Sequence, residues 1–177
     1  MRLFARLALA ALALAACTGK NPYAPGTTIG TFRLTGQRGA ATCGDAADAP
    51  NPWTFDVRFS RDGATLYWLQ NRAPVSGAVG ADRKVHLETS DTRTSTVTLR
   101  KGAPPVSCTV TRTDAFDAVL GPDEPLGDAG TGGFSSLTGT LRYTFAADDP
   151  EACAALGDPS LSVMPCELVY AVSGSKK

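Results

Sequence analysis

The sequence predicts a single all-β domain of about eight or nine antiparallel strands, joined mostly in chain order. From Ile29 onward, apolar residues alternate with polar ones, which is the period of strands with one buried face. Turn-forming residues such as Asp62-Gly63 and Gly102-Ala103-Pro104-Pro105 separate the alternating segments. Helix signals are limited to one short segment near residues 150–156.

The domain is expected to cover residues 29–177 and to form an up-and-down barrel. An exposed strand edge can pair with other chains, and closing a meander into a barrel removes both edges most directly. A two-sheet sandwich is the alternative. A barrel of this size has room either for packed side chains or for one small ligand, as lipocalin-like barrels do.

The clearest hairpin is predicted for residues 53–70. Asp62-Gly63 suits a two-residue turn, because both residue types tolerate positive φ. That turn pairs Phe59 with Leu66 and places the large apolar residues of both strands on one face. Upstream of it, residues 31–35 read as another strand.

Residues 83–112 are predicted to form a three-stranded meander. A loop at Asp91-Thr92-Arg93 pairs Leu87 with Val97, and the break at residues 102–105 begins the third strand. The face opposite to the apolar residues is rich in Thr and Arg, as expected for a solvated sheet face.

The last two strands are predicted at residues 137–145 and 166–173, with Leu168 opposite Tyr143 and Tyr170 opposite Leu141. Gly139 is a candidate position for a bend or bulge.

A short helix should lie in the loop between these two strands. Asp149 suits the N-cap, Pro150 the first helical position and Glu151 the first turn, and Gly157 should end the helix. Two acidic clusters are candidates for Ca²⁺ binding: Asp123, Glu124 and Asp128 in the Gly-rich loop at residues 121–133, and Asp148, Asp149 and Glu151 at the start of the helix. Their spacing matches no known calcium motif, so solvated loops explain them better, and no metal site is predicted.

The N-terminal residues have the three parts of a secretory signal. Arg2 and Arg6 are followed by an unbroken apolar run, residues 7–16, which is too short for a transmembrane helix of about 20 residues. The run ends at Leu14-Ala15-Ala16-Cys17. This segment resembles the lipobox of bacterial lipoprotein signals, in which the cysteine is lipidated and the preceding residues are removed.

The resemblance implies that residues 1–16 are absent from the mature protein and that lipid on Cys17 holds it in a membrane. Residues 17–28, rich in Pro, Gly and polar residues, would form a flexible tether. Thr18 follows the cysteine where an Asp would mark inner-membrane retention, so the resemblance favours the outer membrane of the bacterial envelope.

Four cysteines remain, and an even number in an exported chain predicts two disulfides. Cys153 and Cys166 flank one local loop, so the favoured pairs are Cys153–Cys166 and Cys43–Cys108. Close Cys-x-x-Cys spacing is absent and the chain has a single histidine, which argues against zinc.

The charges give no sign of nucleic-acid binding. The 17 basic and 17 acidic residues balance, and loss of Arg2 and Arg6 with the signal leaves a slight acidic excess without a basic stripe.

No arrangement typical of a catalytic site is recognisable, and no cofactor is predicted. His86 should face solvent with Lys84 and Glu88. Arg58 and Tyr67, predicted opposite each other on the outer face of the hairpin, form a possible ligand or partner surface. Trp53 and Trp68 have inward parity, so core packing is the default for them.

The leading hypothesis is therefore a non-enzymatic, membrane-anchored envelope protein with a binding or structural role. The mature part resembles small β-rich lipoproteins of Gram-negative bacteria only in composition and layout. One alternative is a barrel that binds a small ligand. Another is a hydrolase with an unfamiliar carboxylate site drawn from Asp56, Asp123, Asp148 and Asp149. The weakest is an inhibitor that presents residues 121–133 to a partner.

Overall fold

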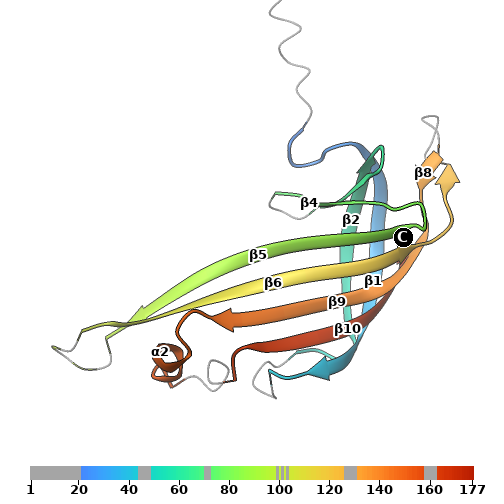
Figure 1. Ribbon diagram of the computed structural model, residues 1–177. Helices are drawn as coiled ribbons and strands as arrows, with labels where there is room; N and C mark the ends of the chain where they lie inside the picture. Colours follow the sequence, from blue (N-terminus) through green and yellow to red (C-terminus); the bar gives the residue numbers. More distant parts are fainter. Residues whose placement is uncertain are drawn as a thin grey trace, which may run out of the picture.

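The computed structural model describes residues 21–43, 49–69, 73–98, 100, 102, 104–125, 131–157 and 163–177 (Figure 1). The signal segment and Cys17 therefore lie outside the described residues. The strands of the main sheet are β1 (Thr27–Ala41), β2 (Trp53–Asp62), β3 (Thr65–Leu69), β4 (Val75–Ala78), β5 (Lys84–Val97), β6 (Val106–Leu120), β9 (Ser136–Ala147) and β10 (Cys166–Lys176). No helix among these residues is long and apolar enough to cross a membrane.

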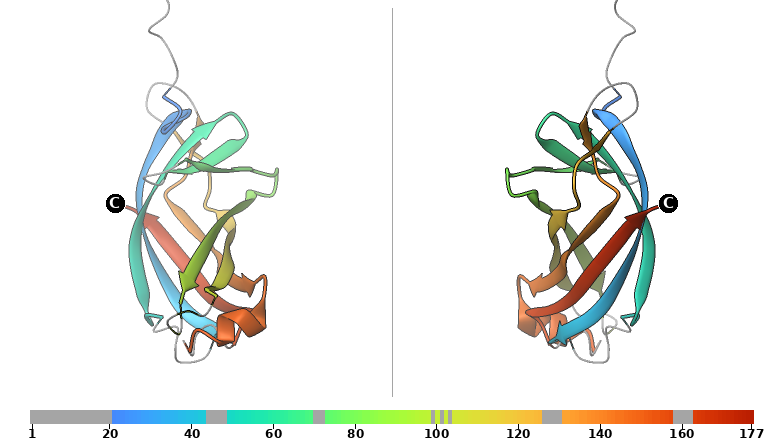
Figure 2. Two further views of the ribbon diagram at one scale, coloured as in Figure 1. Left: turned by 90° about the vertical axis from the view of Figure 1, so that its left-hand side faces the viewer. Right: turned by 90° about the vertical axis from the view of Figure 1, so that its right-hand side faces the viewer.

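The eight strands form one antiparallel sheet in the order β4-β3-β2-β1-β10-β9-β6-β5. Strands that follow one another in the chain lie side by side in this sheet, except that the β7–β8 hairpin comes between β6 and β9 in the sequence. β1 pairs with both β2 and β10, which joins the first strand of the sheet to the last. The two outer strands, β4 and β5, meet through a bridge between Val79 and Val85 and a hydrogen bond from Gly80 N to Lys84 O (2.8 Å). The sheet thus wraps into a nearly closed up-and-down barrel, with β1 and β2 on one side and β5 and β6 on the other (Figure 2). The prediction of an all-β barrel is confirmed.

One end of the barrel is filled by aromatic side chains. Phe134 is fully buried, and its ring lies 4.8 Å from that of Phe32 and 5.8 Å from that of Phe59. It follows the small hairpin of β7 (Glu124–Pro125) and β8 (Thr131–Gly133), which forms a separate two-stranded sheet. Arg61 on β2 holds this hairpin by donating from Nη1 to the carbonyl of Gly132 (3.1 Å).

The closing part of the chain folds as predicted. Leu168 pairs with Tyr143 and Tyr170 with Leu141 in the β9–β10 hairpin. The helix α2 (Pro150–Ala154) begins after Asp149, whose side chain accepts a hydrogen bond from Ala152 N. Gly139 lies in regular pairing rather than in a bulge; it is required because a Cβ there would lie 2.2 Å from the carbonyl oxygen of Asp117.

The hairpin at residues 53–70 has a different register from the predicted one. Asp62 pairs with Thr65, so the turn residues are Gly63 and Ala64 and Phe59 lies opposite Trp68. Gly63 has φ of 57°, as suits the first central position of a type II′ turn. The shift is by two residues, so each side chain stays on its predicted face.

The three-stranded meander predicted for residues 83–112 is wrong in its first turn, although β6 does begin at Val106, directly after the predicted break at residues 102–105. No turn forms at Asp91-Thr92-Arg93; β5 runs straight through it and pairs along its whole length with β6. The segment contains neither Gly nor Pro, and Thr is favourable in strands. Hydroxyl pairs such as Thr92–Thr111 (3.0 Å) join the two strands on one face.

The predicted disulfide pairs are also wrong, although all four cysteines are bonded. The pairs are Cys43–Cys166 and Cys108–Cys153. The β1–β10 register places Ala41 opposite Leu168 and, two residues further on, brings Cys43 beside Cys166. Closeness in sequence suggested a bond within the last loop, but pairing between the ends of the domain decides the partner.

The seam between β4 and β5 should depend on the lack of a side chain at Gly77. A Cβ added there would lie 2.0 Å from the carbonyl oxygen of His86. We expect Gly77→Ala to lower the free energy of unfolding by about 2 kcal/mol, measured by urea denaturation.

Gly39→Ala is the matched control, since a Cβ at that position would meet its nearest neighbour at 3.7 Å. It should change stability by less than about 0.5 kcal/mol. Equal effects of the two substitutions would contradict a tight seam.

Candidate functional site

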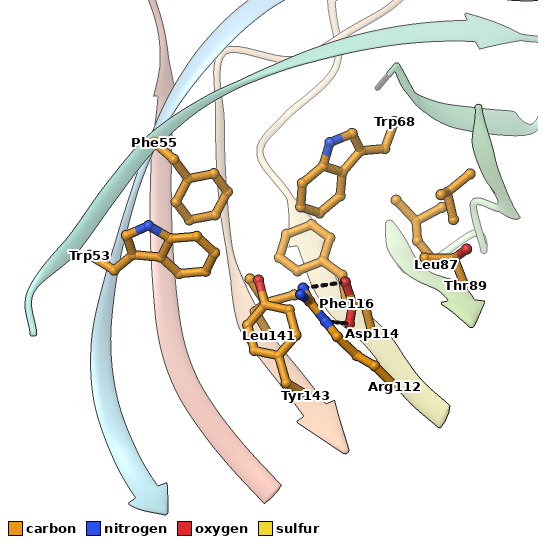
Figure 3. A pocket seen from close by; sticks show the side chains of 11 residues that line it. Trp53, Phe55, Trp68, Leu87, Thr89, Arg112, Asp114, Phe116, Leu141 and Tyr143 are labelled. Atoms are coloured by element: carbon orange, nitrogen blue, oxygen red, sulfur yellow. Dashed lines mark hydrogen bonds and ion pairs between the residues drawn. The ribbon is translucent and has the colours of Figure 1, made fainter. Parts of the chain in front are cut away.

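A pocket opens inside the barrel at the end away from Phe134 (Figure 3). Its volume is about 250 Å³, and strands from both sides of the barrel contribute to its wall. The lining residues are Trp53, Phe55, Trp68, Val75, Leu87, Thr89, Arg112, Asp114, Phe116, Leu141 and Tyr143.

One wall of the pocket is aromatic. Trp53 stacks on Phe55 with ring centroids 4.2 Å apart, and Trp68 meets Phe116 edge to face at 5.4 Å. Trp53 and Trp68 are only partly buried, and they are the two tryptophans of the chain. Aromatic rings that are reachable from solvent offer flat, apolar surface to a ligand.

Strand parity places these rings in the pocket. Trp53 and Phe55 share the inward face of β2 with Val57 and Phe59. Val57 and Phe59 are buried in the filled half of the barrel, whereas Trp53 and Phe55 stand at the start of the strand, where the barrel is open. The same alternation therefore produces core at one end and ligand-accessible surface at the other.

An ion pair between Arg112 and Asp114 forms the polar side of the pocket. The guanidinium donates from Nε to Oδ1 (2.5 Å) and from Nη2 to Oδ2 (2.7 Å), a bidentate arrangement. The charge of Arg112 also lies over the ring of Tyr143, 4.5 Å from its centroid. Burial is the largest single effect and lowers the pKa of Arg112, but the hydrogen bond and charge of Asp114, together with Tyr143 and Asp91, raise the pKa above its ordinary value.

Tyr143 is held as a neutral phenol. Its side chain is largely buried beside Trp53 and Tyr170, and this burial, more than the nearby Asp114, raises its pKa well above the usual value. Tyr143 therefore offers its ring to Arg112 without adding a negative charge at neutral pH.

Beyond the ion pair the inner face becomes more charged. Asp91 lies opposite Arg112 in the β5–β6 register, and Arg93 donates from Nε to Asp91 Oδ2 (3.1 Å). The lining of the pocket thus changes from aromatic rings to the ion pair of Arg112 and Asp114, and then to the exposed charges of Asp91 and Arg93. This arrangement suits a ligand with one flat apolar part and one polar end.

The sequence prediction missed the polar part of this site. Arg112 and Asp114 share inward parity with Phe116 on β6, and this parity was the available signal. The predicted surface pair is not formed as expected, because Arg58 lies opposite Leu69 and Tyr67 opposite Ser60. Both residues remain on the outer face of the hairpin, away from the pocket.

The acidic residues proposed for a hydrolytic site have other partners. Asp56 accepts hydrogen bonds from Arg33 (3.0 Å) and Lys177 (2.5 Å), which lower its pKa to about 2. Asp123 lies 3.6 Å from Arg61, and Asp149 caps α2. Asp148 directly precedes Asp149, so Asp56, Asp123 and the adjacent pair Asp148–Asp149 belong to three separate segments of the chain. Asp128, considered for calcium binding only, lies outside the described residues. Within the described part of the chain, no cluster of His, Cys, Asp and Glu is arranged to hold a metal ion.

Comparisons of this chain with models of protein families, with curated proteins and with solved structures find no match. The interpretation of the pocket therefore depends on its own geometry.

His86, on the outer face, provides a test of the local electrostatics. Its Nδ1 lies 2.7 Å from Asp117 Oδ1 and its Nε2 lies 3.5 Å from Glu88 Oε2. The hydrogen bond with Asp117 is the main cause that raises its pKa. Because the folded pKa exceeds the unfolded value of about 6.5, the protonated ring stabilises the fold at lower pH. This contribution is lost as pH rises through the folded pKa.

His86 is the single histidine of the chain, so its ring protons can be followed by NMR during a pH titration. We expect a pKa above 6.5 that falls in Asp117→Asn. An unchanged pKa in that variant would show that Asp117 does not hold the ring. Thr113→Ala, elsewhere on the same face of β6, is the control.

Proposed function

We propose that this protein is an exported lipoprotein whose barrel binds a small ligand in the pocket lined by Trp53, Trp68 and Arg112. The observation that carries the proposal is the partly exposed aromatic wall beside a bidentate ion pair, inside a barrel whose other end is filled. Buried rings would be explained by core packing alone. Rings that line an open pocket next to a charged pair are typical of ligand sites.

The ligand is small, flat and amphipathic. The volume of about 250 Å³ lies just below the range of about 300–1,000 Å³ for ordinary ligand pockets. Trp53 and Trp68 would contact its apolar part. Its polar end would lie toward Thr89, Arg112 and Asp114, where hydrogen-bond donors and acceptors converge.

The membrane part of the proposal is supported by the lipobox at residues 14–17. Lipid chains contribute about 0.8 kcal/mol for each buried methylene, so the two or three chains of a bacterial lipoprotein form a stable anchor. The described chain starts at Asn21, close to β1, which leaves only a short connection to Cys17. Because β1 begins opposite Arg61 at the filled end of the barrel, the protein would be attached to the membrane through that end, with the pocket at the opposite end and the outer membrane the favoured location.

Replacing Cys17 with Ala tests the anchor. We expect the Cys17→Ala protein to leave the membrane fraction, because the acyl chains would have no attachment point. Cell fractionation with immunoblotting measures this. Thr18→Ala is the control and should stay with the membranes; membrane association of both variants would refute lipidation at Cys17.

Ligand binding can be followed through the two tryptophans, because both line the pocket. The probe is 8-anilinonaphthalene-1-sulfonate, which has flat rings and one anionic group. We expect saturable energy transfer from tryptophan to the probe. Thr89→Phe should fill the pocket and weaken binding by about tenfold, or about 1.4 kcal/mol.

Thr96→Phe provides the matched control for that titration. It is the same substitution on the same strand, at an exposed position that does not line the pocket. Its affinity should stay within about twofold of the parent protein. If Thr89→Phe and Thr96→Phe bind the probe equally well, the pocket is not the binding site.

A further inference from the structure

The outer half of β5 carries an open strand edge. β5 is the last strand of the sheet order, paired with β6 along its whole length. On its other side it meets β4 near Val85, and no described strand pairs with residues 88–97 there. The described pairing of β6 with β9 ends at Val110, opposite Arg93, and in Figure 1 the β5–β6 hairpin extends past β9 beyond this point.

The backbone groups on this edge can be assigned from the closing seam. The carbonyl of Arg83 accepts from Leu120 N, toward β6, whereas that of Lys84 accepts from Gly80 N, toward β4. Along a strand, successive residues direct their backbone N–H and C=O groups to opposite sides of the strand. The even-numbered residues Ser90, Thr92 and Thr94 therefore direct their N–H and C=O groups to the open edge.

The side chains of this segment form two different faces. Hydroxyl pairs across β5 and β6 line the outer face: Ser90–Thr113, Thr92–Thr111, Thr94–Thr109 and Thr96–Ser107, all within 3.0 Å. On the inner face, Asp91 and Arg93 stand two residues apart with opposite charges.

We propose that this edge pairs with the same edge of a second copy of the chain, antiparallel, with Thr92 on the two-fold axis. In this register Thr92 faces Thr92 of the second copy, and Ser90 faces its Thr94. Asp91 then lies opposite Arg93 of the other copy, and each Arg93 opposite an Asp91. The contact is isologous and closes as a dimer.

The charges of Asp91 and Arg93 favour this register over other antiparallel registers of the two β5 edges. Moving the axis to Ser90 or Thr94 places Asp91 opposite a neutral residue and loses both cross-copy charge pairs. Inward-pointing charges on an edge strand usually prevent pairing with other strands. Here the order Asp91–Thr92–Arg93 is self-complementary in antiparallel pairing. These charges therefore favour pairing with a second copy of the chain, although they oppose pairing with other strands.

Pairing would also complete the hydrogen bonding of an exposed ribbon. The described pairing of β6 with β9 ends at Val110, opposite Arg93, so the hairpin beyond Arg93 is a two-stranded ribbon, which is marginal in water. Joining two copies in the order β6-β5-β5-β6 would pair the backbone groups of both open edges. The hydroxyl rows would continue across the new contact, since Thr92 of each copy would stand side by side. None of this depends on the pocket.

Disulfide trapping in a Cys17→Ala background, where the other four cysteines are already bonded to each other, tests the register. Opposed strand residues have Cα atoms about 5.5 Å apart, within the range for a disulfide. Thr92→Cys should therefore give a covalent dimer on a non-reducing gel after mild oxidation. Thr94→Cys is the matched control, because its two copies would lie about 13 Å apart. The double variant Ser90→Cys/Thr94→Cys should cross-link again.

Charge reversal provides an independent test by sedimentation velocity. Asp91→Arg places like charges opposite each other and should weaken dimerisation by about tenfold or more. The exchange Asp91→Arg/Arg93→Asp restores opposite pairs and should recover the dimer. Unchanged tryptophan emission would show that each variant is folded. A monomer at all concentrations, or equal cross-linking at Thr92 and Thr94, would overturn the proposal.

Discussion

The pairing of β1 with β10 is the interaction on which the rest of the structure depends. It joins strands from opposite ends of the domain and turns a chain of neighbouring hairpins into a closed wall. The same register brings Cys43 beside Cys166, so a disulfide links the strands where the pairing ends. Closure leaves β4 and β5 to meet at a narrow seam, which Gly77 makes possible. Without this pairing the inward faces would enclose no common interior.

The closed wall gives its inward residues two roles. At one end Phe32, Phe59 and Phe134 fill the interior, and the loop that carries Phe134 covers it. At the other end the rings of Trp53 and Trp68 are partly exposed beside Arg112 and Asp114. The pocket borders this core directly, because the ring of Trp68 lies 6.1 Å from that of Phe59. The Arg112–Asp114 ion pair on the polar side of the pocket remains partly exposed to solvent.

Parity could be predicted from the sequence, but long-range register could not. The β9–β10 pairing was predictable because alternation and a capped helix agree on it. In the hairpin around Gly63 a two-residue shift preserves every face, so alternation alone cannot detect the error. The disulfides depend on β1 meeting β10, which no local pattern reveals. Strand alternation directs Arg112 and Asp114 inward although both are charged, and charged residues at inward positions are typical of functional sites.

We propose that the open end of the barrel receives a ligand between Trp53 and Trp68. The most direct measurement is the NMR signal of the two indole N–H groups during titration with 2-naphthoate, a flat ring with one carboxylate. We expect both indole signals to shift together and saturate, accompanied by the Arg112 side-chain signal. Shifts confined to residues on the outer face, such as Tyr67, or no shift of the indole signals, would contradict it.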